Sequence, residues 1–265
     1  GALADTDVVP ISVTSASLWV SSVGSASVPP GAGGTSWTDG QVVSFGNPNL
    51  ALGAGTTGGT FSSVFNIDTF AADGDADVNG LHRVSRAVTI GSGGNTISLQ
   101  AGDVLLTTAA SETLGGVAVT NRQVVLFRPT TPGDYSAGTF TGPPDDPPGR
   151  RLRDLTLVET PTVVGGVTLA SGEFLFTLQG ATQEKHIWRF TPSGAGAGTT
   201  SGTLTQFIDG ATANLPQAVY GIELIQQVTT LGGQTLSAGQ LLLSLESDSG
   251  AGGVGSNGLV VTRYD

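Results

Sequence analysis

The chain contains no cysteine and no methionine among its 265 residues. The absence of cysteine excludes disulfide bonds, thiolate zinc sites and cysteine nucleophiles. Because there is no methionine, Gly1 is not the initiating residue, and we expect a processed protein whose leader has been removed. An exported bacterial protein that does without disulfides fits both absences. We therefore expect the protein outside the cell or on the cell surface.

Charged residues are also few, at 12% of the chain, and the ten basic and twenty-one acidic residues give a net charge of −11. An acidic surface repels polyanions, and so few cations release few counterions from a phosphate backbone, which argues against nucleic acid as a partner. No stretch approaches the ~18 apolar residues that span a bilayer, and none is both basic and amphipathic, so we expect no membrane insertion. The 38% hydrophobic content still predicts a folded core.

Short strand-like segments take the place of helices. Sustained helical periodicity is absent, and segments rich in Val, Ile, Thr and aromatic residues are bounded by Gly, Pro, Asn and Asp, as is typical of β-strands. Four apolar runs share one design, and the last three each follow a glycine. These runs cover residues 17–22, 103–108, 173–178 and 240–245. Such internal similarity predicts a repeat protein.

Further strand-like segments accompany each apolar run. Upstream β-rich stretches cover residues 81–90, 155–164 and 220–228. In the first three copies a second strand follows at residues 41–45, 123–129 and 186–192. A third strand follows a Gly/Thr-rich turn at residues 57–61, 137–140 and 201–204. We expect one all-β repeat domain of four antiparallel units, at about residues 8–72, 81–150, 152–212 and 219–265.

Three short motifs recur in these units: a Gly-Asp-Val-Leu-Leu strand at residues 102–106, Phe-x-Pro at residues 127–129 and 190–192, and Gly-Thr at residues 138–139 and 202–203. Together they resemble repeats of very large secreted bacterial surface proteins, often found beside cadherin-like or calcium-binding repeat regions. The resemblance implies a propeller-like array of four units. Units of nearly 70 residues exceed the ~40–50 of familiar propellers, so a β-sandwich or stacked β modules are the alternatives.

The fourth unit is predicted to be incomplete. Residues 259–265 align with residues 117–123, after which the second unit continues into further strands. An unpaired sheet edge is a template for another strand. The segment with Asp7, Val8, Val9 and Ile11 could supply that strand to the edge that carries Val260, Val261 and Tyr264. Within one chain this closes a propeller, and between chains it builds a filament or surface layer. The third interpretation is a piece of a longer repeat protein.

One acidic segment has the spacing of calcium ligands. Asp73, Asp75, Asp77 and Asn79 alternate with other residues, and a glycine follows them, as at the start of a calcium loop. When Asp75 is taken as the first ligand, the twelfth position is Arg86 and not the usual glutamate. The segment therefore predicts either a calcium site or a solvated acidic turn.

The aromatic and histidine residues suggest one further candidate. Trp37 stands in a polar loop and is the aromatic side chain that we expect to contact a ligand such as a sugar ring. Trp19 and Trp188 lie in apolar strands and are expected in the core. We interpret His82 and His186 as polar residues at strand edges, because nothing in the sequence brings them together with carboxylates.

No motif of a nucleophile elbow, a zinc protease or a phosphate loop occurs, so we expect no enzyme activity. The predicted function is that of an exported structural or adhesive β-repeat protein, which assembles with itself through its incomplete last unit. The alternative is a carbohydrate-binding module that recognises surface glycans, assisted by calcium. A propeller glycoside hydrolase comes third, and it requires two carboxylates in a central cleft.

Overall fold

The computed structural model describes residues 11–14, 17–22, 24–27, 33–34, 36–46, 59–142, 150–180, 183–196, 199–215, 217–231, 234–246 and 259–262. The described residues form strands β1 to β24 and one short 3₁₀ helix, η1 (Ile67–Thr69), with no α-helix among them. The all-β prediction is confirmed. None of these residues belongs to a helix that could cross a membrane.

Most strands belong to four large sheets, which we number along the chain. The first has the order β1 (Ile11–Thr14), β2 (Ser17–Val20), β4 (Gln41–Gly46), β5 (Thr60–Asn66), β3 (Gly33–Gly34). The second has β6 (Val78–Arg83), β9 (Val104–Thr108), β12 (Val125–Thr131), β13 (Asp134–Thr141), with β6 and β13 at its edges. The third has β14 (Leu152–Leu157), β17 (Phe174–Leu178), β18 (Ile187–Gly196), β19 (Thr199–Ile208). The fourth has β20 (Val219–Leu224), β23 (Leu241–Leu245), β24 (Leu259–Thr262).

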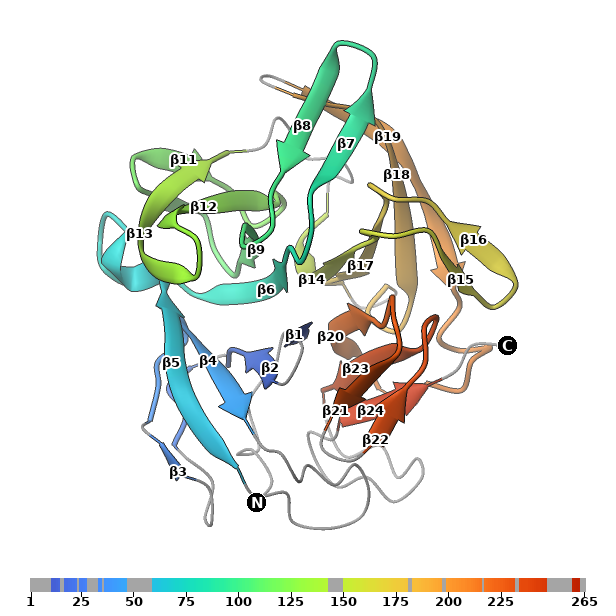
Figure 1. Ribbon diagram of the computed structural model, residues 1–265, viewed down its shortest axis with the longest axis horizontal. Helices are drawn as coiled ribbons and strands as arrows, with labels where there is room; N and C mark the ends of the chain where they lie inside the picture. The colour runs from blue at the N-terminus through green and yellow to red at the C-terminus, as the bar shows by residue number, and fades with distance from the viewer. Residues whose placement is uncertain are drawn as a thin grey trace.

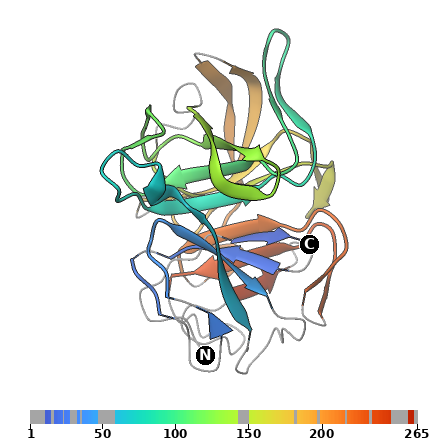
Figure 2. The same ribbon diagram turned by 60° about the vertical axis from the view of Figure 1, so that its left-hand side comes forward.

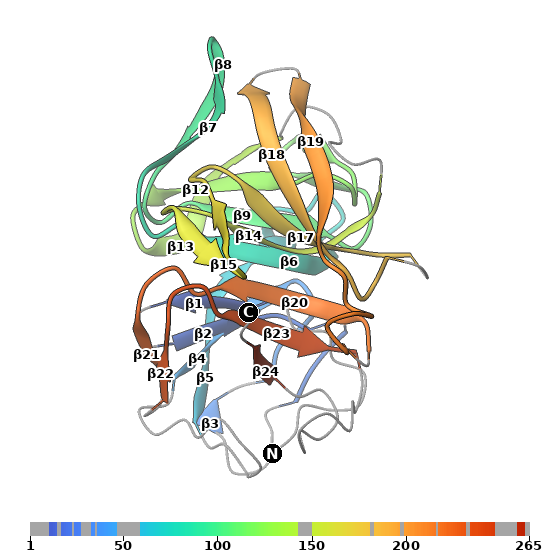
Figure 3. The ribbon, with the colours of Figure 1, turned by 90° about the vertical axis from the view of Figure 1, so that its right-hand side faces the viewer.

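Four small hairpins complete the described structure. They are β7 (Val88–Ser92) with β8 (Asn95–Leu99), β10 (Glu112–Leu114) with β11 (Val117–Val119), β15 (Thr162–Val164) with β16 (Val167–Leu169), and β21 (Thr229–Leu231) with β22 (Gln234–Leu236). The hairpin of β7 and β8 packs against β18 and projects from the molecule on the same side as the ends of β18 and β19 (Figure 3).

The four apolar runs form the second strand of each large sheet, namely β2, β9, β17 and β23. Every residue of β9, β17 and β23 is buried. A strand that is covered on both faces reads as a continuous apolar run and not as an alternating one, which explains why these segments stand out in the sequence.

The Gly-Thr motif is explained by an aromatic ring. In three sheets a phenylalanine of the third strand lies against a glycine that is inside the next strand or directly precedes it. A Cβ atom on that glycine would come within 2.5 Å of the ring. The pairs are Phe45 with Gly59, Phe127 with Gly138 and Phe190 with Gly202. Only glycine leaves room for the ring at these positions.

The large sheets lie side by side around the middle of the molecule, with β1, β6, β14 and β20 nearest the centre (Figure 1). Strand β14 contacts both β6 and β20, and β1 contacts the same two strands. The first and fourth sheets lie next to each other in the lower half of Figure 2.

Each large sheet shares a hydrophobic core with two others. Phe65 of the first sheet packs with Phe127 of the second, and Leu126 of the second with Phe176 of the third. The third and fourth sheets share one core, and the fourth and first sheets share another. Each fully buried Leu or Phe stabilises the fold by about 1.5–3 kcal/mol, so these shared cores hold the sheets together.

The structure corrects the alignment of the fourth unit. Strand β24 pairs with β23, Val260 opposite Leu243 and Val261 opposite Leu242, in the place that β12 takes beside β9. It is therefore the third strand of its sheet, whereas residues 117–119 form β11 in a small hairpin. Short Val/Leu runs look alike in sequence, and the pairing alone tells them apart.

The N-terminal strand also differs from the expectation. Ile11 belongs to β1, the edge strand of the first sheet nearest the centre, and pairs with Val20. Because its backbone is part of the first sheet, Ile11 does not supply a strand to the fourth, and that part of the prediction is wrong. Asp7, Val8, Val9 and Tyr264 lie outside the described residues.

Candidate functional site: a buried polar centre

Three strands near the centre, each from a different sheet, carry a polar side chain at the equivalent position. These side chains are His82 on β6, Thr156 on β14 and Glu223 on β20, which pair with Leu105, Leu175 and Leu242. Nδ1 of His82 lies 3.4 Å from Oε2 of Glu223, and the hydroxyl of Thr156 donates to the same oxygen at 3.1 Å. His82 is 2% exposed and Glu223 is 5% exposed, so three sheets meet through buried polar groups.

A second polar layer follows these strands. Oε1 of Glu159 lies 3.0 Å from Nε2 of His82 and accepts the backbone N–H of Ser85 at 2.7 Å. The Ser85 hydroxyl donates to the other oxygen of Glu159. Oε1 of Gln226 accepts the backbone N–H groups of Glu159 and Thr160, at 2.6 and 3.0 Å. Each of these three residues directly follows one whose backbone N–H donates to the carbonyl just before the apolar strand of its unit. The donors are Val84, Val158 and Ile225. Ser85, Glu159 and Gln226 therefore occupy corresponding positions in the three units.

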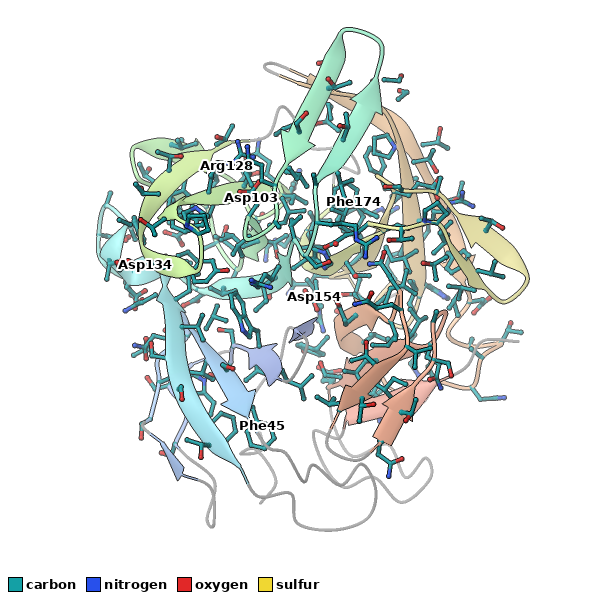
Figure 4. All side chains as sticks on the ribbon, viewed as in Figure 1. Phe45, Asp103, Arg128, Asp134, Asp154 and Phe174 are labelled. Carbon is teal, nitrogen blue, oxygen red and sulfur yellow. The ribbon has the colours of Figure 1, made fainter. Side chains whose placement is uncertain are left out.

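The third layer contains one carboxylate. Asp154 is fully buried, and its two oxygens accept the backbone N–H groups of Leu81, at 2.9 Å, and Ile222, at 2.7 Å. The corresponding positions on β6 and β20 are Gly80 and Gly221. A Cβ atom on Gly80 would lie 2.8 Å from Oδ1 of Asp154 and closer still to the backbone of β14, so glycine makes room for the carboxylate. Figure 4 shows Asp154 in the middle of the molecule.

The contacts fix the charges of this centre. Burial opposes the protonation of His82, but the charge of Glu223 and the hydrogen bonds to Glu159 and Glu223 outweigh it and raise the pKa of His82 to about 10. Burial favours the protonated form of Glu159, but its hydrogen bonds and charge interaction with His82 and its bonds from Ser85 outweigh burial and lower the pKa of Glu159. At neutral pH an imidazolium therefore lies between two glutamates.

A pocket of about 250 Å³ opens beside the polar centre, and His82, Glu159 and Glu223 line it. Two carboxylates in one pocket are what a glycoside hydrolase needs, and one of them must act as an acid with a raised pKa. The contacts of Glu159 lower its pKa instead. Both nitrogens of His82 face carboxylates, which leaves neither as a free base.

Further bidentate ion pairs lie away from the centre. The guanidinium of Arg128 donates to both oxygens of Asp103 at 2.9 and 2.6 Å, and Arg189 donates to Glu173 at 3.0 and 2.7 Å. Asp103 and Arg128 lie beside each other in Figure 4. Both acids come directly before an apolar strand and also accept a backbone N–H three residues earlier, so they anchor the turn into that strand.

The predicted calcium ligands are only partly brought together. Carboxylate oxygens of Asp75 and Asp77 lie with one of Asp39 within 4.8 Å of one another. Asp73 instead accepts the N–H of Asp75, and the amide of Asn79 donates to the carbonyl of Leu152. Burial, followed by the neighbouring Asp39, raises the pKa of Asp77 to about 6. Asp39 comes from the first unit, so spacing along the chain could not have indicated it.

Trp37 is buried, contrary to the expected exposure. Its side chain is 3% exposed and stacks on Phe61, with ring centroids 4.9 Å apart. It belongs to the core that the first and fourth sheets share. Polar neighbours in the sequence suggested a solvent-exposed loop, but backbone bonds to Ala26 hold Trp37 against the first sheet. A buried ring offers no face for a sugar.

The sequence did not indicate that His82 meets carboxylates. His82 lies on the edge strand β6 but is buried between Glu159 and Glu223, whereas His186 lies just before β18 and pairs with Asp209 at 3.4 Å. A signal for the centre was available in the upstream stretches: Leu81-His82-Arg83, Leu155-Thr156-Leu157 and Ile222-Glu223-Leu224. Aligning them places a polar residue at the equivalent position of all three strands, directly after a Leu or Ile.

Comparisons of the chain with protein-family models, with curated proteins and with solved structures found no match. The function is therefore inferred from the buried polar centre and the pocket beside it.

Proposed function

We propose that the four large sheets are the blades of a propeller-like array, with β1, β6, β14 and β20 around its axis. Two observations support this arrangement. Hydrophobic cores join each sheet to two neighbours, from the first through the fourth and back to the first. Corresponding residues of three units also meet at the centre, as His82, Thr156 and Glu223 do. The resemblance to secreted surface repeats agrees with the same design.

We further propose that the protein is exported and non-enzymatic, with a structural or adhesive role. The observation that carries this proposal is the network of His82 with Glu159 and Glu223. A general acid or base works best with a pKa near the working pH. Here each contact moves the pKa of His82 up and that of Glu159 down, so the groups stay charged. Such a network links three sheets, and at neutral pH it holds its proton tightly between His82 and the glutamates.

Hydrolysis assays test the non-enzymatic role. We expect no hydrolysis of a panel of chromogenic glycosides by the purified chain. Glu159→Gln serves as the matched variant. Hydrolysis by the wild-type chain that this variant loses would contradict the proposal and favour the hydrolase.

Self-assembly by strand addition is the proposed route to a filament or surface layer. The fourth sheet has three strands, and among the described residues only β23 pairs with β24. The outer edge of β24 is therefore the place where a strand of a second copy would add. Asp7, Val8 and Val9 remain the proposed donor segment.

A pair of proline variants tests this edge. In an antiparallel strand, neighbouring residues direct their N–H groups to opposite sides. Of Val260→Pro and Val261→Pro, one therefore removes a bond to β23 and the other removes an N–H from the outer edge. We expect concentration-dependent oligomers in sedimentation, which the outer-edge variant loses while it keeps the wild-type unfolding midpoint. A monomer at all concentrations would contradict strand addition.

The second candidate function is calcium-assisted carbohydrate binding. The polar pocket of about 250 Å³ favours it, while the burial of Trp37 removes the aromatic contact first expected. A glycan array tests it directly, with binding expected in the wild-type chain and unchanged binding expected in Trp37→Phe. If the chain binds no glycan on the array, this candidate function is wrong, and the proposed structural role is unaffected.

A further inference from the structure

The pocket beside the polar centre is lined by residues that correspond in three units. His82 and Glu223 come from strands near the centre, and Ser85, Glu159 and Gln226 form the next layer. Arg86, Thr160 and Gln227 follow directly in the sequence and line the same pocket. Three units thus contribute polar groups to one cavity of about 250 Å³.

One carboxylate oxygen of the pocket lining is not used by the polar network. Oε2 of Glu223 is bonded by Thr156 and lies near His82, but Oε1 has no hydrogen-bond partner in the described part of the chain. The residue is 5% exposed and lines the pocket. A donor on a ligand can therefore bond to Oε1 without displacing a donor of the protein.

An exposed arginine also lines the pocket. Arg86 is exposed, and its side chain makes no ion pair within the described residues. Arg83, in contrast, donates to the Tyr135 hydroxyl at 2.9 Å and lies over the Trp19 ring. Arg86 is therefore free to donate to an acceptor on a ligand.

The charges of the pocket select for a neutral ligand. His82, Arg83 and Arg86 face Glu159 and Glu223, so the lining contains charges of both signs. The three positive groups would repel a cation, and the two carboxylates would repel an anion. A neutral hydroxyl group can bond to both kinds of side chain, because it donates to a carboxylate and accepts from a guanidinium.

We propose that this pocket binds one neutral sugar ring, whose hydroxyl groups donate to Oε1 of Glu223 and accept from Arg86. The cavity is smaller than the roughly 300–1,000 Å³ of drug-sized sites, which fits a single ring. This inference rests on the carbohydrate-binding candidate and assigns it a site.

The test is titration of the full-length chain with glucose, galactose and mannose, followed by calorimetry or saturation-transfer NMR. For so small a contact we expect saturable binding with Kd of roughly 0.1–10 mM for at least one of them. Arg86→Ala should weaken binding at least about tenfold, the effect of losing one charge-assisted hydrogen bond. Arg150→Ala, an exposed arginine outside the pocket, is the matched control and should bind as the wild type does.

Glu223→Gln should also weaken binding, and its circular dichroism shows whether the centre is intact. Should this variant unfold, Gln227→Ala on the exposed side of the pocket replaces it, with at least a several-fold loss expected. Unchanged affinity in Arg86→Ala would overturn the site while leaving carbohydrate binding in place. No binding of any neutral sugar, or binding of glycine or acetate instead, would overturn the inference and leave the structural role untouched.

Discussion

The buried carboxylate of Asp154 accepts the backbone N–H of Ile222 at 2.7 Å. Its other oxygen accepts the N–H of Leu81. One side chain of β14 thus takes the place of a backbone carbonyl for both β6 and β20. Strands that meet at the centre of separate sheets have no continuous backbone pairing with one another. Side chains such as Asp154 therefore satisfy the N–H groups that would otherwise be buried without acceptors.

Asp154→Asn should destabilise the protein by about 2–4 kcal/mol, because it replaces one acceptor with an NH₂ group that faces a buried N–H donor. Urea unfolding followed by tryptophan fluorescence measures this loss. Asp134→Asn is the control, since Asp134 is exposed and, among the residues that the structure describes, its carboxylate bonds to Ser136 in its own turn. Equal effects of the two substitutions would show that Asp154 does not link the strands.

The pH dependence of stability reports on His82. Its pKa is raised from 6.5 to about 10 by folding, so the folded state binds this proton more tightly than the unfolded state. The stabilisation is complete below pH 6.5 and is lost as the pH rises through 10. Between these limits we expect the wild-type chain to lose about 2–4 kcal/mol relative to His82→Gln.

Unfolding free energies of both chains at several pH values from 6 to 10.5 measure this difference. Since the two chains share every other titrating group, subtraction isolates His82. A difference that stays constant over this range would contradict a charged His82 between two glutamates.

The acidic cluster should lose stability in the same direction but at lower pH. Burial and the charge of Asp39 raise the pKa of Asp77 from 3.8 to about 6, so the folded state favours the protonated form. Stability is lost as the pH rises through 6. Asp77→Asn should therefore stabilise the protein at pH 7.5 by about 1 kcal/mol after solvent screening is allowed for, and should be neutral at pH 3.5.

Calcium distinguishes the two interpretations of this cluster. If the ion binds there, millimolar Ca²⁺ raises the melting temperature of the wild-type chain, and Asp75→Ala abolishes the rise. Asp73→Ala should then have a smaller effect, because Asp73 is not among the three converging carboxylates. Identical melting curves with and without Ca²⁺ would leave the cluster as a solvated turn.

The repeat motif predicts a steric effect at Gly138. A Cβ atom there would lie 2.4 Å from the ring of Phe127, so Gly138→Ala should cost about 1–3 kcal/mol. Gly94→Ala is the matched control in an exposed hairpin turn, with no neighbouring atom within 4 Å of the added carbon. Differential scanning calorimetry of both variants tests the difference, and a neutral Gly138→Ala would refute the steric explanation of the motif.

The sequence predicted strands well and their partners less well. Residues 103–108 and 240–245 are recognisable because strands buried on both faces are apolar throughout. Local pattern says little about which strand pairs with which, and for that reason β24 was aligned with β11 instead of β12. Trp37 was misplaced for a related reason, since its polar neighbours describe the loop but not the core beneath it.

The site was the least predictable part. His82, Glu159 and Glu223 lie 64 to 141 residues apart in sequence and meet only when three units pack together. Only the alignment of the upstream strands, with one polar residue at the same step, could have indicated them. The convergence of Asp39 with Asp75 and Asp77 has no counterpart in local spacing at all.

The most direct test of the account is a double-mutant cycle on His82 and Glu223, with His82→Gln, Glu223→Gln and the double variant measured by urea unfolding at pH 7. Contact between these residues predicts a coupling free energy of at least about 1 kcal/mol, whereas residues that are far apart add within about 0.5 kcal/mol. Additive losses would mean that β6 and β20 do not meet, and the proposed centre would not exist.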